Sequence, residues 1–161
     1  MFGIDTFSWY KIIHLHSNGW NVLLEEILNI TSIFITYEVQ KELNYRFPGH
    51  EEIFTLVTIL PKLDEQFKTF TLKDFDEADA SLLSFSHKEG FIIITEDHPM
   101  LNEGITDKKN IIQLADFFAQ LYIDNFLTRR EFHKLIRSLK KMKNISKRKE
   151  KDLIKLLKNA Y

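Results

Sequence analysis

Four carboxylates occur where strands are predicted to end or where a helix presents a face toward such an end, namely Asp5, Glu42, Asp79 and Asp97. Asp5 follows the apolar residues 2–4, and Asp97 closes the apolar run 91–95. In an open parallel sheet, ligands bind outside the carboxyl ends of the strands, where the strand order reverses. Carboxylates gathered at such a point repel one another unless a cation lies between them. The pattern therefore predicts a site for hard divalent metal ions and chemistry on phosphates.

Each of these acids also has a purely structural interpretation. Asp5 is a good N-cap for the helix that follows it, and Asp97 suits the cap of the next turn. Asp79 lies in the first turn of a predicted helix, where an acid offsets the helix dipole. Glu42 on its own is typical of an exposed helical residue. For single residues these alternatives stay open, and only the order, spacing and strand-end placement of all four favour a site.

The pattern of apolar residues predicts helices that alternate with short buried strands. Strands are expected at residues 2–5, 32–35 and 91–95, and helices at 7–17, 20–29, 36–47 and 76–88. Residues 51–60 fit either element, and residues 67–72 are expected to be extended. Such alternation is typical of an α/β fold, here three α/β/α layers around a central parallel sheet with right-handed crossovers.

The C-terminal part differs from the rest in composition. We expect residues 1–110 to form the α/β core and residues 111–161 to form a basic helical extension packed on the same domain. Three helices are expected in this extension. The first covers residues 111–123, the second follows the capping box of Thr128 and Glu131, and the third begins at Ser146. Residues 1–128 hold 9 Lys and Arg against 20 Asp and Glu, whereas residues 129–161 hold 13 against 3. The net charge is therefore −11 for residues 1–128 and +10 for residues 129–161. The basic segment could bind nucleic acid, an acidic partner or the acidic body of its own chain, and it is equally typical of a solvated helix face.

Composition excludes several classes of protein. A chain of 161 residues without Cys fits one domain that has no disulfide, no thiolate nucleophile and no zinc–thiolate site. The absence of Cys suits a cytoplasmic location. No basic segment followed by an apolar one opens the chain, and no apolar run is long enough to span a membrane, so neither a signal peptide nor a membrane partner is expected. A glycine-rich phosphate loop and a dinucleotide fingerprint are absent from the sequence.

Four segments together resemble the motifs of the PIN-domain family of metal-dependent ribonucleases. They are Gly3-Ile4-Asp5-Thr6; Phe34-Ile35-Thr36 followed by Val39 and Glu42-Leu43; Asp79-Ala80-Ser81-Leu82-Leu83 running on to Gly90; and Ile93-Ile94-Thr95-Glu96-Asp97. The resemblance covers about residues 1–110, and the remainder is similar to prokaryotic members with added C-terminal helices. Phe7 departs from the pattern, because a small polar residue often follows the Asp-Thr pair of the family.

The resemblance implies hydrolysis of RNA phosphodiester bonds. The four principal acids would be both the catalytic residues and the ligands of one or two Mg²⁺ or Mn²⁺ ions. Thr6 and Thr95 would support these carboxylates through hydrogen bonds. Glu38 and Asp76 compete with Glu42 and Asp79 for their positions, and Glu96 would be an auxiliary acid.

The implied partners follow from this activity. The expected protein is an endoribonuclease with an RNA substrate, and one form of it is the toxin of a toxin–antitoxin pair, blocked by a small antitoxin protein. The alternative is a catalytically silent PIN-like module that binds RNA or protein, and a nuclease directed at DNA is a third reading. The family often forms dimers, so a homodimer through residues 111–123 is a further expectation.

Overall fold

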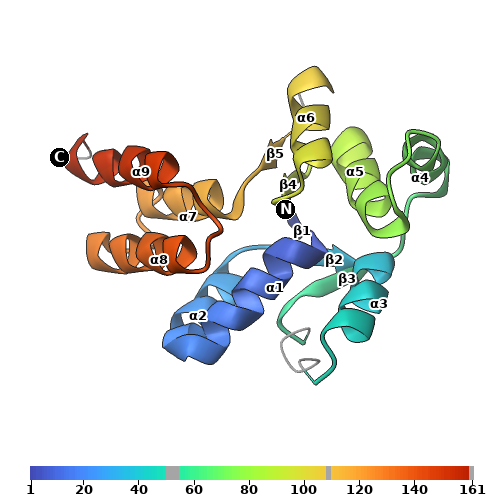
Figure 1. The fold of residues 1–161 in the computed structure, drawn as a ribbon. Helices are drawn as coiled ribbons and strands as arrows, with labels where there is room; N and C mark the ends of the chain where they lie inside the picture. Colours follow the sequence, from blue (N-terminus) through green and yellow to red (C-terminus); the bar gives the residue numbers. More distant parts are fainter. Residues whose placement is uncertain (50–54, 108–109, 160–161) are drawn as a thin grey trace. The chain divides into compact units, whose positions relative to one another are not determined.

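The computed structural model describes residues 1–49, 55–107 and 110–159 and shows an α/β fold with a parallel sheet (Figure 1). Five strands form this sheet in the order β3-β2-β1-β4-β5, and every neighbouring pair is parallel. The strands are β1 (Phe2–Ile4), β2 (Ile33–Thr36), β3 (Thr58–Leu60), β4 (Ile92–Ile94) and β5 (Ile111–Ile112). The prediction of an α/β fold around a parallel sheet is thus confirmed.

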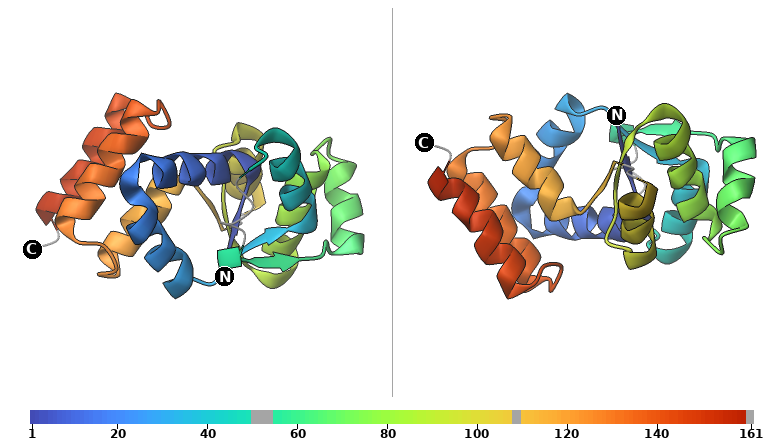
Figure 2. Two further views of the ribbon diagram at one scale, coloured as in Figure 1. Left: turned by 90° about the horizontal axis from the view of Figure 1, so that it is seen from below. Right: turned by 90° about the horizontal axis from the view of Figure 1, so that it is seen from above.

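Helices cover both faces of the sheet (Figures 1 and 2). On one face lie α1 (Thr6–Leu15), α2 (Asn21–Ile30) and α3 (Tyr37–Arg46), with a π-helical turn, His16–Trp20, between the first two. On the other face lie α5 (Glu77–Glu89) and α6 (His98–Asp107), with α4 (Asp64–Thr71) packed against α5. Right-handed crossovers produce this division, because the chain steps from β1 to β3 in one direction and to β4 and β5 in the other.

The strand order reverses between β1 and β4. The two strands lie side by side with Ile4 opposite Ile94, and the N–H of Asp5 donates to the carbonyl of Ile94 at 3.0 Å. The connection after β1 leads to β2 on one side, whereas β4 lies on the other side and leads away to β5. The carboxyl ends of β1 and β4 therefore mark the switch point at which this class of sheet binds ligands.

Short local signals begin and end the helices near this edge. Asp5 caps α1 by accepting from the N–H of Ser8 at 2.6 Å, and Thr36 caps α3. Asp76 caps α5 in the same way, and α5 ends at Gly90, which adopts a φ of +67° that favours glycine. These caps were predictable because each involves residues only a few positions apart.

Three predicted segments were wrong. Residues 67–72 belong largely to helix α4 rather than to an extended piece, and the buried Phe70 with Phe67 three residues before it has helical spacing. Residues 98–100, expected to form a turn capped by Asp97, instead open the helix α6, whose first turn tolerates Pro99. Residues 111–112 form β5 because they pair with β4, so the helix predicted from 111 begins at Leu114.

Within the ambiguous segment 51–60, residues 58–60 form β3, and residues 51–54 lie outside the described residues.

The chain divides into two compact units, Met1–Ile112 and Gln113–Tyr161. The second unit contains α7 (Leu114–Ile123), α8 (Arg129–Lys141) and α9 (Lys147–Asn159). The capping box of Thr128 and Glu131 is present at the start of α8. Helix α8 buries one apolar stripe, which consists of Phe132, Leu135, Ile136 and Leu139. In the described part of the chain, no helix combines the length and the apolar character needed to cross a membrane.

We expect Gly3→Ala to destabilise the first unit by about 1–3 kcal/mol. A Cβ at Gly3 would lie 2.7 Å from Cζ of Phe34 and 2.8 Å from Cδ1 of Ile93, both of which are buried. Urea unfolding followed by circular dichroism measures the difference. Asn44→Ala, at an exposed helical position, is the control. Equal stability of Gly3→Ala and the unmodified protein would contradict the packing described for β1.

Candidate functional site

Four carboxylates lie close enough to Asp79, at the carboxyl edge of the sheet, to act on it electrostatically. The pKa of Asp79 is raised from 3.8 to about 8, first by its burial and then by the negative charges of Asp76, Asp5, Asp97 and Glu42. The structure therefore brings together all four acids predicted as site residues. Within the described residues, no donor forms a hydrogen bond with the Asp79 carboxylate.

Asp5 is the most firmly held of the four acids. It is 2% exposed, and it accepts hydrogen bonds from the N–H of Ser8 at 2.6 Å, from the N–H of Glu96 at 3.4 Å and from the hydroxyl of Thr95. Burial nevertheless raises the pKa of Asp5, because these hydrogen bonds only partly offset the loss of hydration. Asp5 is thus both the predicted N-cap and a member of the cluster.

Thr95 connects Asp5 to Asp97. Its hydroxyl donates to Asp5 and accepts from the N–H of Asp97 at 2.9 Å. The Asp97 carboxylate in turn accepts from the N–H of Met100 at 3.0 Å and so caps α6. The capping role that the sequence suggested for Asp97 is therefore real, although the capped element is a helix rather than a turn. Its remaining oxygen is available to the cluster.

Glu42 reaches the cluster from α3. The Thr6 hydroxyl donates to its Oε2 at 2.5 Å, and Nε of Arg46 lies 2.6 Å from its Oε1. The side chain of Arg46 is 48% exposed and is one helical turn away, so this contact is a surface ion pair of small energetic weight. The guanidinium therefore does not neutralise the cluster permanently. The supporting hydrogen bonds expected from Thr6 and Thr95 are both present.

The auxiliary acids differ in their surroundings. One oxygen of Asp76 is engaged as the cap of α5, and Glu96 contributes its backbone N–H, not its carboxylate, to Asp5. Oε2 of Glu38 is buried without a hydrogen-bond partner among the described residues.

Beside the cluster lies a hollow of about 420 Å³ whose existence the sequence did not reveal. Its lining consists of Glu38, Lys41, Glu42, Tyr45, Asp76, Glu77 and Ala78. Lys41 and Tyr45 belong to none of the sequence motifs, although their spacing from Glu38 places all three on one face of α3. The hollow extends the candidate site from the acids toward the start of α5.

The donor chemistry suits a hard cation, but the geometry is open. Across residues 1–49, 55–107 and 110–159, no group of three or more His, Asp or Glu side chains is arranged to hold a metal ion. Mg²⁺ commonly keeps several waters and binds through only one or two carboxylates. The all-oxygen cluster therefore fits a largely hydrated Mg²⁺ or Mn²⁺ ion and not a closed cage of protein ligands.

Comparisons of the chain with protein-family models, with curated proteins and with solved structures give no match. The inference of function therefore depends on the carboxylate cluster and its position in the sheet.

In the absence of divalent metal, we expect Asp79→Asn to stabilise the protein at pH 8 by about 1–3 kcal/mol. The folded state holds a proton on Asp79 up to about pH 8, whereas the unfolded chain releases it near pH 3.8. This group therefore makes stability fall as the pH rises between those values. The gain from Asn should accordingly be much smaller at pH 5. Thermal unfolding in EDTA at both pH values provides the measurement.

Glu26→Gln is the matched control, because it removes one exposed negative charge outside the cluster. It should change the melting temperature little and equally at both pH values. A lower melting temperature for Asp79→Asn at pH 8 would show that the charges around Asp79 are compensated in a way that the structure does not contain.

Proposed function

We propose that this protein is a metal-dependent endoribonuclease with a PIN-like fold that hydrolyses RNA phosphodiester bonds. The observation that supports the proposal best is the raised pKa of Asp79, which results first from burial and then from the negative charges of four neighbouring acids. Strongly perturbed carboxylates in a crevice are typical of functional sites. The order of the acids along the chain also agrees with the family that the sequence resembles.

A bound Mg²⁺ or Mn²⁺ ion would supply activation of a water molecule and stabilisation of charge on the phosphate oxygens. The side chains have separate tasks in this scheme. Asp5, fixed by Thr95 and Ser8, provides a carboxylate whose position is set before the cation arrives. Asp97 and Glu42 present oxygens from α6 and α3. Asp79 gives up its proton when positive charge enters the cluster.

The proposed substrate is RNA, and a small antitoxin protein is the proposed partner if the protein is the toxin of such a pair. Both assignments, and the proposal of a homodimer, come from the resemblance in sequence, whereas residues 111–123 are the proposed dimer contact because of their apolar face. An inhibitor of this site would have to offer positive charge to the cluster, as an Arg side chain does.

A catalytically silent module is the second candidate, because the described carboxylates form no three-ligand group. Such a protein would keep the fold and the acidic crevice but would bind cations too weakly for catalysis. Metal binding distinguishes the two candidates before any substrate is known.

We expect the affinity of the protein for Mn²⁺ to increase with pH below pH 8, by at most about tenfold per pH unit, and to be constant above pH 8. The reason is that Asp79 must release its proton before the cation binds. Isothermal titration calorimetry in buffers of different ionisation enthalpy reports both the affinity and the number of protons released. Asp79→Asn should remove most of the pH dependence. Failure to bind Mn²⁺ at millimolar concentration and pH 8 would favour the silent module.

We expect Asp5→Asn and Asp97→Asn each to lower Mg²⁺-dependent RNA cleavage by about 100-fold or more. Asn keeps the size of Asp and its capping ability, so the fold should be retained. Gel assays with labelled RNA measure the rate, and circular dichroism checks folding. Asp64→Asn, an exposed acid in the first turn of α4, is the control and should retain full activity. Full activity in either site variant would refute the assignment of that residue.

A further inference from the structure

The second unit has a charge opposite to that of the first. Residues 113–161 hold 13 Lys and Arg against 5 Asp and Glu, a net of +8, whereas residues 1–112 hold 9 against 18, a net of −9. The carboxylate cluster belongs to the acidic unit and repels a polyanion. A nuclease with such a site needs a separate surface that attracts RNA, and the second unit contains a candidate.

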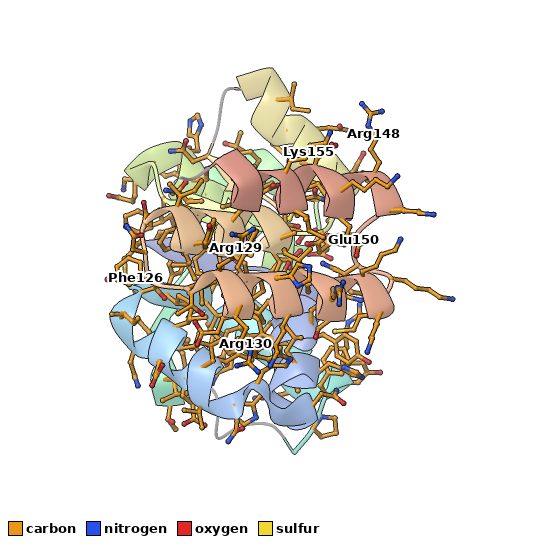
Figure 3. The ribbon with its side chains drawn as sticks, turned by 90° about the vertical axis from the view of Figure 1, so that its left-hand side faces the viewer. Phe126, Arg129, Arg130, Arg148, Glu150 and Lys155 are labelled. Carbon is orange, nitrogen blue, oxygen red and sulfur yellow. The ribbon has the colours of Figure 1, made fainter. Side chains whose placement is uncertain are left out.

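This surface is a hollow of about 530 Å³ along α9, which we call the α9 basic hollow. It is lined by Lys147, Arg148, Lys151, Asp152 and Lys155. Three of the lysines are four residues apart, so they stand on one face of the helix at intervals of about 6 Å. Leu153 is buried on another side of α9. Figure 3 shows Arg148 extending outward from the same helix.

Most cations of the α9 basic hollow are not neutralised by the protein. Lys155 contacts Asp152 at 3.2 Å. Lys147, Arg148 and Lys151 form no ion pair with any of the described residues. Lys149 lies outside the hollow and pairs instead with Asp116 on α7 at 2.5 Å. The cations of α9 are therefore divided between Lys149, which pairs with α7, and several that line the α9 basic hollow without an ion pair to a described residue.

The composition of the hollow indicates which polyanion it fits. Among the residues that the structure describes, no apolar or aromatic side chain lines it. A membrane-surface helix would expose Trp, Phe or Leu beside its cations, and an acidic protein partner would need an apolar centre in the interface. A regular row of Lys with one Arg suits phosphates that repeat along a strand, without reading of the bases.

We propose that the α9 basic hollow binds the phosphate backbone of single-stranded RNA and delivers the substrate to the protein. The inference rests on the proposed ribonuclease activity, because it names the surface that holds the substrate of that site. Binding through this surface is independent of sequence and of divalent metal, and it weakens steeply with salt because bound counterions are released.

The test uses the full chain and a triple charge reversal, Lys147→Glu, Arg148→Glu and Lys151→Glu. Binding of fluorescein-labelled poly-U is followed by fluorescence anisotropy in EDTA, over a series of salt concentrations. We expect at least about a tenfold loss of affinity at low salt and a salt slope that is lower by about 2, since three phosphate contacts are lost. Lys62→Glu, Lys68→Glu and Lys88→Glu, three exposed positions of the first unit, form the matched control and should bind nearly as the unmodified protein does.

Circular dichroism and thermal unfolding establish that the reversed variant is folded. A neutral variant, Lys147→Gln, Arg148→Gln and Lys151→Gln, provides a second measurement and should lose affinity to a smaller extent. Unchanged affinity and slope in both variants would overturn the proposal. Binding to anionic phosphatidylserine vesicles or to polyglutamate, without binding to poly-U, would overturn it in favour of a membrane or an acidic protein.

The two proposals fail in different ways. EDTA prevents cleavage, so the anisotropy experiment measures binding alone. RNA binding that depends on the α9 basic hollow therefore supports this inference even if the protein does not cleave RNA with Mn²⁺. Conversely, metal-dependent cleavage with the same KM in the unmodified protein and in the reversed variant would refute this inference but not the proposed ribonuclease activity.

Discussion

Mutual repulsion among carboxylates at one edge of the sheet is the constraint on which the candidate site depends. Burial raises the pKa of Asp5, and burial followed by the negative charges of neighbouring acids raises the pKa of Asp79. A protein selected only for stability would replace such groups with neutral side chains. Their presence together at one edge of the sheet is the basis of the proposed cation site.

The fold partly offsets this repulsion by the direction of its helices. α1, α3 and α6 follow parallel strands and so begin at the carboxyl edge of the sheet. α5 precedes β4 and runs antiparallel to it, so α5 begins at the same edge. The positive ends of four helix dipoles therefore meet the acids, and three of these helices are capped by Asp5, Asp76 or Asp97. The caps hold the acids in place, and the raised pKa of Asp79 shows that the compensation is incomplete.

The two units divide the electrostatic tasks of the proposed nuclease. The acidic unit provides a crevice that attracts cations, and the same charge keeps RNA away. The basic unit presents unpaired cations on α9 and uses Lys149 for an internal ion pair with Asp116. Such a division would let affinity for RNA and affinity for a cation respond separately to salt and pH, because the carboxylate cluster contains Asp79, whose pKa is raised to about 8.

The sequence by itself determined the features that arise from neighbouring residues. The caps at Asp5 and Thr36, the glycine stop at Gly90 and the capping box of Thr128 are hydrogen-bond patterns within a few positions, so residue types predict them. The alternation of helices and buried strands likewise gave the parallel α/β sheet. The gathering of the four acids was predictable only because parallel strands place their carboxyl ends at one edge.

Only the tertiary structure decided the remaining features. The pairing of Ile111 with Ile93 made a strand of residues that looked helical, because hydrogen bonding to a neighbouring strand overrides local propensity. The protonation of Asp79, the Arg46 contact to Glu42 and the open arrangement of the carboxylates depend on distances between residues brought together from separate elements. No local pattern encodes such distances, since packing of the helices on the sheet sets them.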